Sequence, residues 1–184
     1  MNRERKIAII AGALILIAYG AVVSGLTDSK AVIIIIEAVS GLAVVFIALL
    51  MYRVFNPHNH TIALWFAVIR MAEGIVLTLA AFLYLPDNKI LLEVHQWLYM
   101  VHPFVFILSG LLFYYLFYRS KLIPRFISVW GGIALIMLLV VNILELTGCS
   151  SAAAQILYLP LVLNEFFLAI WLIARGFSVS KASG

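Results

Sequence analysis

The chain has 184 residues, of which 66% are hydrophobic and only 11% charged, and its formal net charge is +4. Soluble domains are typically about half apolar and about a quarter charged, so this composition excludes an ordinary soluble protein and favours a membrane protein. The positive charge does not indicate a nucleic-acid-binding surface, because the cations are scattered over four segments that flank apolar stretches. The expected surroundings of the protein are therefore a lipid bilayer.

Six apolar segments follow one another along the chain. Each has about 20 residues or more, which at a rise of about 1.5 Å per residue spans a hydrocarbon core of about 30 Å. None of them alternates apolar and polar residues in the way that barrel strands do. The sequence therefore predicts an all-α fold, with a single six-helix transmembrane domain over residues 1–184 and helices at about 7–26, 31–52, 62–85, 94–118, 126–146 and 153–174.

The basic residues predict how these helices are oriented. Nine of the 12 lysines and arginines fall on one side of the predicted bundle: Arg3, Arg5, Lys6, Arg53, Arg119, Lys121, Arg125, Arg175 and Lys181. The connections on the other side hold only Lys30 and Lys89. Because cytoplasmic loops carry the excess of Lys and Arg, we expect a multi-pass protein of the cytoplasmic (inner) membrane with both termini inside.

Arg70 and Glu73 lie one helical turn apart inside the apolar run at 62–85. Ionisable groups are costly at such a depth and normally have a partner or a function. Glu165 falls near the middle of the run at 153–174, at a similar depth, and is therefore the expected partner of Arg70. Since two acids then face one guanidinium, we expect one carboxyl to carry a proton. These three residues predict a polar site within the membrane.

Further polar residues are predicted between this site and the outer surface: Glu37, His95, Tyr99, His102 and Asn142. His95, Tyr99 and His102 share one stripe of the helix at 94–118, together with Ser109. The inner halves of the helices are almost wholly apolar. We therefore expect a water-accessible cavity that opens outward and is floored by Arg70.

Two prolines and one tyrosine lead to more local expectations. Pro103 and Pro160 fall inside the predicted helices 94–118 and 153–174, where each removes a helical hydrogen bond, so a kink or a freed carbonyl is expected at both positions. Tyr114 is expected to lie at the cytoplasmic membrane interface, where aromatic rings are enriched.

Three functions remain open. In the first, the site binds, and transports with protons, a small polar or cationic ligand, and in so small a chain transport is expected to require a homo-oligomer. In the second, it is a metal-dependent membrane enzyme. In the third, the protein is an assembly or regulatory subunit, and the charges only clamp one helix to another. No nucleophile motif and no nucleotide-binding fingerprint is present, so enzyme activity is left open.

A metal ion would be held by His102, Glu73 and Glu165, because imidazole and carboxylate ligands suit zinc, iron or manganese. No H-E-x-x-H motif accompanies them. Haem is not expected, because His95 and His102 are separated by roughly 10 Å along one helix and cannot ligate opposite faces of one porphyrin.

Four stretches resemble a known family: RKIAIIAGALILI, IRMAEG, YRSKLIPRFISVWGG and LYLPLVLNEFFLAIWLIARGF. They are similar to prokaryotic multi-pass membrane proteins of the domain-of-unknown-function family four-three-eight-six, and the similarity spans nearly the whole chain. The resemblance implies a six-helix membrane domain with no established activity. It also marks Arg70, Glu73, Glu165 and the loop at 119–125 as characteristic positions, whereas His95 and His102 belong to none of its motifs.

Overall fold

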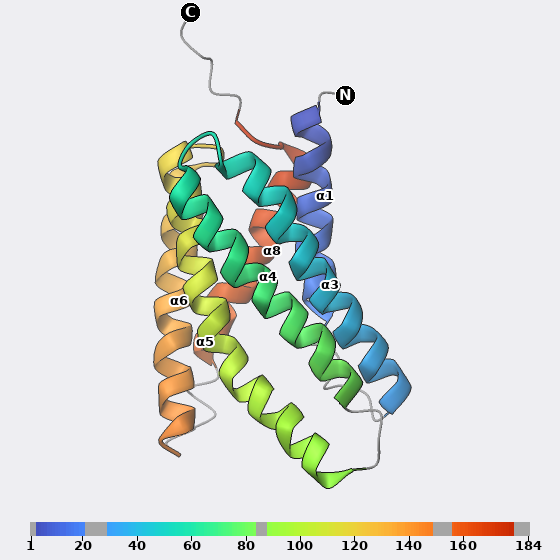
Figure 1. Ribbon diagram of the computed structural model, residues 1–184. Coiled ribbons are helices and arrows are strands. Elements are labelled where there is room, and N and C mark those ends of the chain that lie inside the picture. Colours follow the sequence, from blue (N-terminus) through green and yellow to red (C-terminus); the bar gives the residue numbers. More distant parts are fainter. Residues whose placement is uncertain (1–2, 21–28, 84–87, 149–155, 179–184) are drawn as a thin grey trace, which may run out of the picture.

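The computed structural model is a bundle of helices (Figure 1) and describes residues 3–20, 29–83, 88–148 and 156–178. The helices are α1 (Arg3–Ala18), α3 (Lys30–Phe55), α4 (His60–Leu83), α5 (Lys89–Ser120), α6 (Arg125–Leu146) and α8 (Leu159–Ala174), with a short 3-10 helix, η1 (Ile156–Tyr158), before α8. No strand occurs in these ranges. The predicted all-α membrane bundle is confirmed.

Five of the described helical segments are long and apolar enough to cross a membrane, namely α3, α4, α5, α6 and the continuous stretch Ile156–Ala174. α1 is described over 16 residues, and the end of the predicted span 7–26 lies outside the described residues. Large apolar side chains face outward, among them Ile35 at 62% and Trp65 and Leu79 at 60% exposure. Such a surface is stable in lipid and would aggregate in water.

The helix ends differ most from the predicted ones at the starts of α5 and α8. α5 begins at Lys89 rather than near residue 94, because the side chain of Asn88 accepts a hydrogen bond from the amide of Ile90 (2.9 Å) and caps the helix. Pro103 lies inside α5 as predicted. The expected break at Pro160 inside a helix is wrong, since Pro160 lies in the first turn of α8, where it costs no hydrogen bond.

The helices form a closed ring in the order α1, α3, α4, α5, α6 and α8, in which each packs mainly against its two neighbours. α8 returns to α1, so the first and last helices lie side by side (Figure 1). The guanidinium of Arg5 donates hydrogen bonds to three carbonyls at the end of α8, those of Leu172 (3.1 Å), Ile173 (2.6 Å) and Ala174 (3.0 Å). These bonds satisfy helix-end carbonyls that have no partner within α8.

α3 and α4 share the most extensive contact of the ring, and their backbones touch where they cross. A Cβ atom added to Gly74 would lie 2.7 Å from the carbonyl oxygen of Gly41 and 2.9 Å from the amide nitrogen of Val45. Small residues at such a crossing allow close packing of membrane helices.

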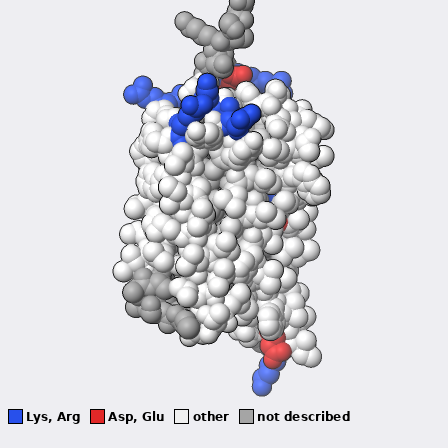
Figure 2. Space-filling view, turned by 90° about the vertical axis from the view of Figure 1, so that its left-hand side faces the viewer, with Lys and Arg blue, Asp and Glu red and all other residues white. Residues whose placement is uncertain are grey.

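One end of the ring is filled by aromatic side chains. Phe55 packs against Phe66 and Phe113 (5.8 Å between ring centroids in both pairs) and against Phe117 (4.9 Å). None of the four is more than 7% exposed. This is the end where α1 begins and α8 ends, and where Lys and Arg side chains gather (Figure 2), so we call it the basic end.

Candidate functional site

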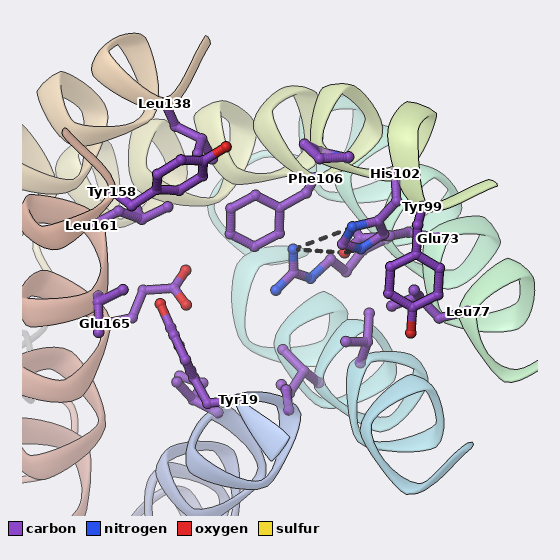
Figure 3. Close-up of a pocket in the computed structure, with 17 residues that line it drawn as sticks. Tyr19, Glu73, Leu77, Tyr99, His102, Phe106, Leu138, Tyr158, Leu161 and Glu165 are labelled. Atoms are coloured by element: carbon purple, nitrogen blue, oxygen red, sulfur yellow. Dashed lines mark hydrogen bonds and ion pairs between the residues drawn. The ribbon is translucent and has the colours of Figure 1, made fainter. Parts of the chain in front are cut away.

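A cavity of about 350 Å³ lies inside the ring, with walls from every helix and from η1. Most of its walls are apolar, and its polar lining residues are Tyr19, Arg70, Glu73, Tyr99, His102, Tyr158 and Glu165 (Figure 3). The cavity therefore places ionisable groups from α4, α5 and α8 around one space.

Arg70, Glu73 and Ser109 form a compact network on one wall. Nη1 of Arg70 lies 3.2 Å from Oε2 of Glu73 and 3.3 Å from Oγ of Ser109. The Ser109 hydroxyl lies 3.0 Å from the same carboxylate oxygen, to which it donates a hydrogen bond. Glu73 is 2% and Arg70 9% exposed, and Ser109 is fully buried. The network neutralises two buried charges and joins α4 to α5.

His102 and Phe106 extend this wall along α5. Nε2 of His102 lies 3.2 Å from Oε1 of Glu73, so the carboxylate is held on both oxygens. The guanidinium of Arg70 lies over the ring of Phe106, 4.9 Å from its centroid, at a distance typical of a cation–π contact. Nε of Arg70 is buried and has no hydrogen-bond partner in the described ranges.

Glu165 lies across the cavity from this network (Figure 3). The hydroxyl of Tyr19 points toward its carboxylate and donates a hydrogen bond to it. No ion pair joins Glu165 to Arg70, although both line the cavity. Arg70 is instead paired with Glu73, one turn away on its own helix, so the partner expected from depth alone is not its contact in the structure.

Glu37 and His95 form a separate pair away from the cavity wall. Nε2 of His95 lies 3.2 Å from Oε2 of Glu37, and both residues are buried. Tyr99 packs its ring against His95 (4.6 Å between centroids) and also lines the cavity. Asn142 does not line the cavity, and its side-chain amide donates a hydrogen bond to the carbonyl of Leu138 in its own helix (2.8 Å).

The three side chains considered for a metal ion do not converge on one point. Glu73 and His102 are in contact, but no hydrogen bond or ion pair joins Glu165 to either of them. Across the part of the chain that the structure describes, no group of three His, Cys, Asp or Glu side chains is arranged to hold a metal ion.

Sequence reasoning missed Tyr19 and misplaced Tyr114. Tyr114 is only 2% exposed, and its hydroxyl lies within electrostatic range of Glu165 and Arg70, so its expected position at the membrane interface is wrong. Spacing gave no signal for Tyr114, because it follows His102 by 12 residues on α5, about a third of a turn away from the direction of His102. No pattern in the sequence singled out Tyr19.

Apolar spans and a group of ionisable side chains inside the ring define a polytopic helical membrane protein with an internal polar cavity. The family model described as Domain of unknown function (DUF4386) matches residues 84–176, about half of the chain, and the chain belongs to this family. The matched range includes His102, Ser109 and Glu165, whereas Arg70 and Glu73 precede it. No curated protein and no solved structure matched the chain.

Proposed function

We propose that the cavity binds a small organic cation and exchanges it for a proton on Glu165. The observation that carries this proposal is the surroundings of Glu165, which is 9% exposed and hydrogen-bonded to the neutral hydroxyl of Tyr19, while Arg70 is occupied by Glu73. A carboxylate at such depth is stable only when it is protonated or paired with a cation. Cation and proton would therefore compete for it.

The rest of the lining supports a cation with an apolar body. Tyr19, Tyr99 and Tyr158 line the cavity, and aromatic faces attract cations. A cavity of about 350 Å³ gives up packing contacts between helices that a pure helix clamp would keep. Ligand binding thus accounts for the cavity better than a packing role does, and a metal-dependent enzyme gains no support from the positions of Glu73, His102 and Glu165.

The proposed binding site opens to the outer side of the membrane. The aromatic side chains around Phe55 fill the ring at the basic end, which leaves the opposite end as the route to the cavity. The cations gathered at the basic end favour its placement in the cytoplasm, with both termini inside.

Reporter fusions test this orientation. A fluorescent protein fused after Ser178 is expected to fluoresce and alkaline phosphatase fused there to be inactive, because phosphatase folds only outside the cytoplasm. The reverse is expected for fusions within the connection at 84–87. Active phosphatase after Ser178 would place the basic end outside and contradict the proposed topology.

Binding is tested with benzyltrimethylammonium, a permanently charged aromatic cation, by calorimetry on the protein in lipid nanodiscs. Glu165→Gln is expected to weaken its affinity at least tenfold, or about 1.4 kcal/mol. Glu93→Gln, which removes an exposed acid of α5, is the matched control and should bind like the wild type. Titration in buffers of different ionisation enthalpy should show proton release with the wild type and none with Glu165→Gln. If the wild type did not bind the probe, or if Glu165→Gln bound it equally well, the proposed function would be wrong.

A further inference from the structure

Three buried polar groups lie between α5, α6 and α8 and do not line the cavity. They are the hydroxyl of Tyr114, the hydroxyl of Ser128 and the side-chain carbonyl oxygen of Asn164, whose residues are 2%, 3% and 0% exposed. None of these atoms has a hydrogen-bond partner among the residues that the structure describes. Buried polar groups nearly always have a hydrogen-bond partner, so three groups without one at a single junction of helices need an explanation.

The packing of the helices brings the three groups together. The ring of Tyr114 lies directly on Gly131, where any Cβ atom would overlap it. Ser128 is one turn before Gly131 on the same face of α6. The amide of Asn164 donates to the carbonyl of Ile127 (3.0 Å), the residue next to Ser128, so α8 meets α6 at the same level.

This junction borders on the acid of the cavity. Glu165 follows Asn164 in the chain, and its carboxyl group lies within electrostatic range of the hydroxyl of Tyr114. Tyr114 lies beyond Ser109 in the direction of the end of α5, which is at the basic end, and Ser128 lies in the first turns of α6 at that end. The polar groups thus continue from Glu165 toward the basic end, on the side of α5 that faces α6.

Water is the partner that suits these groups. Buried waters typically make about three hydrogen bonds to polar groups that lack protein partners. Two hydroxyls and one carbonyl oxygen supply donors and acceptors for such a molecule. The aromatic side chains around Phe55 offer no polar atom, so the α5–α6–α8 junction is the polar route past them.

We propose that ordered water joins Tyr114, Ser128 and Asn164 and carries protons between the basic end and Glu165. Each hydroxyl accepts a proton from a neighbouring water and releases its own to the next acceptor, so the proton ends on the Glu165 carboxylate and no charge stays behind. Asn164 only accepts hydrogen bonds and fixes the water. The proton step rests on the proposed exchange at Glu165, whereas the water site does not.

The water site is tested by X-ray hydroxyl-radical labelling of the whole protein in nanodiscs, read by mass spectrometry. Radicals formed from bound water label side chains beside it even where they are shielded from bulk solvent. Tyr114 is expected to be labelled at least tenfold faster than Phe117, a buried aromatic side chain on the same helix. Ser128→Ala should slow the labelling of Tyr114. Equal labelling of Tyr114 and Phe117 would overturn the water site, whatever the protein binds.

The proton path is tested by stopped-flow in oriented liposomes, with a pH indicator confined to the side of the basic end and benzyltrimethylammonium added to the other side. Tyr114→Phe keeps the ring on Gly131 and should slow the arrival of protons on that side at least tenfold, while the affinity for the probe stays unchanged. Tyr118→Phe, which removes an exposed hydroxyl one turn later, should release protons as fast as the wild type. Unchanged rates in both Tyr114→Phe and Ser128→Ala would overturn the path, whereas an absence of probe binding by the wild type would instead count against the proposed function.

Discussion

Arg70→Met is expected to lower the free energy of unfolding by about 3–5 kcal/mol, the usual cost of removing one partner from a buried ion pair. Glu73 would keep its hydrogen bonds to Ser109 and His102 but would lose the cation that balances its negative charge. Because Glu73 is only 2% exposed, water cannot take the place of that cation. The measurement is reversible unfolding in mixed detergent micelles, followed by far-ultraviolet circular dichroism.

Two variants make this experiment decisive. Arg70→Met combined with Glu73→Gln should recover a large part of the loss, because the uncompensated charge is then gone. Lys89→Met removes an exposed cation from the first turn of α5 and should change the stability by no more than about 0.5 kcal/mol. If Arg70→Met were as stable as Lys89→Met, the network on α4 and α5 would not contribute to the fold.

Gly74→Leu is expected to cost about 3 kcal/mol, at the upper end of the range for overpacking. The atoms that its Cβ would meet include the Gly41 carbonyl oxygen and the Val45 amide nitrogen, and backbone atoms in a packed helix cannot rotate aside as a side chain can. α3 and α4 would have to separate at their crossing. The expected result is a lower thermal midpoint in fluorescence-detected size-exclusion chromatography after heating.

Gly132→Leu is the matched control, because a Cβ added to Gly132 meets nothing within 4 Å. It makes the same change of residue type in another membrane helix and should elute like the wild type after the same heating. Equal midpoints for the two variants would show that close contact at Gly41 is not needed for the packing of α3 against α4.

The helices were predictable because hydropathy acts over whole spans. A run of about 20 apolar residues has few alternatives in a bilayer to forming a helix. The helix ends were less predictable, since they depend on single contacts such as the Asn88 cap of α5. Pro160 shows the same limit, because one residue decides whether a proline interrupts a helix or begins it.

The depth of the site residues in the membrane was predictable, but which carboxylate pairs with Arg70 was not. Counting along the helices places Arg70, Glu73 and Glu165 at similar depths, and all three line one cavity. Depth does not fix the rotation of each helix about its axis, and this rotation decides that Glu73 rather than Glu165 pairs with Arg70. Tyr114 was misplaced for the same reason, as its depth suits an interface while its direction is inward.

The contact between α1 and α8 has a consequence for biogenesis. Arg5 reaches the carbonyl of Leu172 across 167 positions of the chain, and Tyr19 and Glu165 complete the same cavity from these two helices. A nascent chain leaving the ribosome therefore inserts most of its spans before either wall can close. The cavity is therefore completed only when α8 is inserted beside α1, after α3, α4, α5 and α6 have entered the membrane.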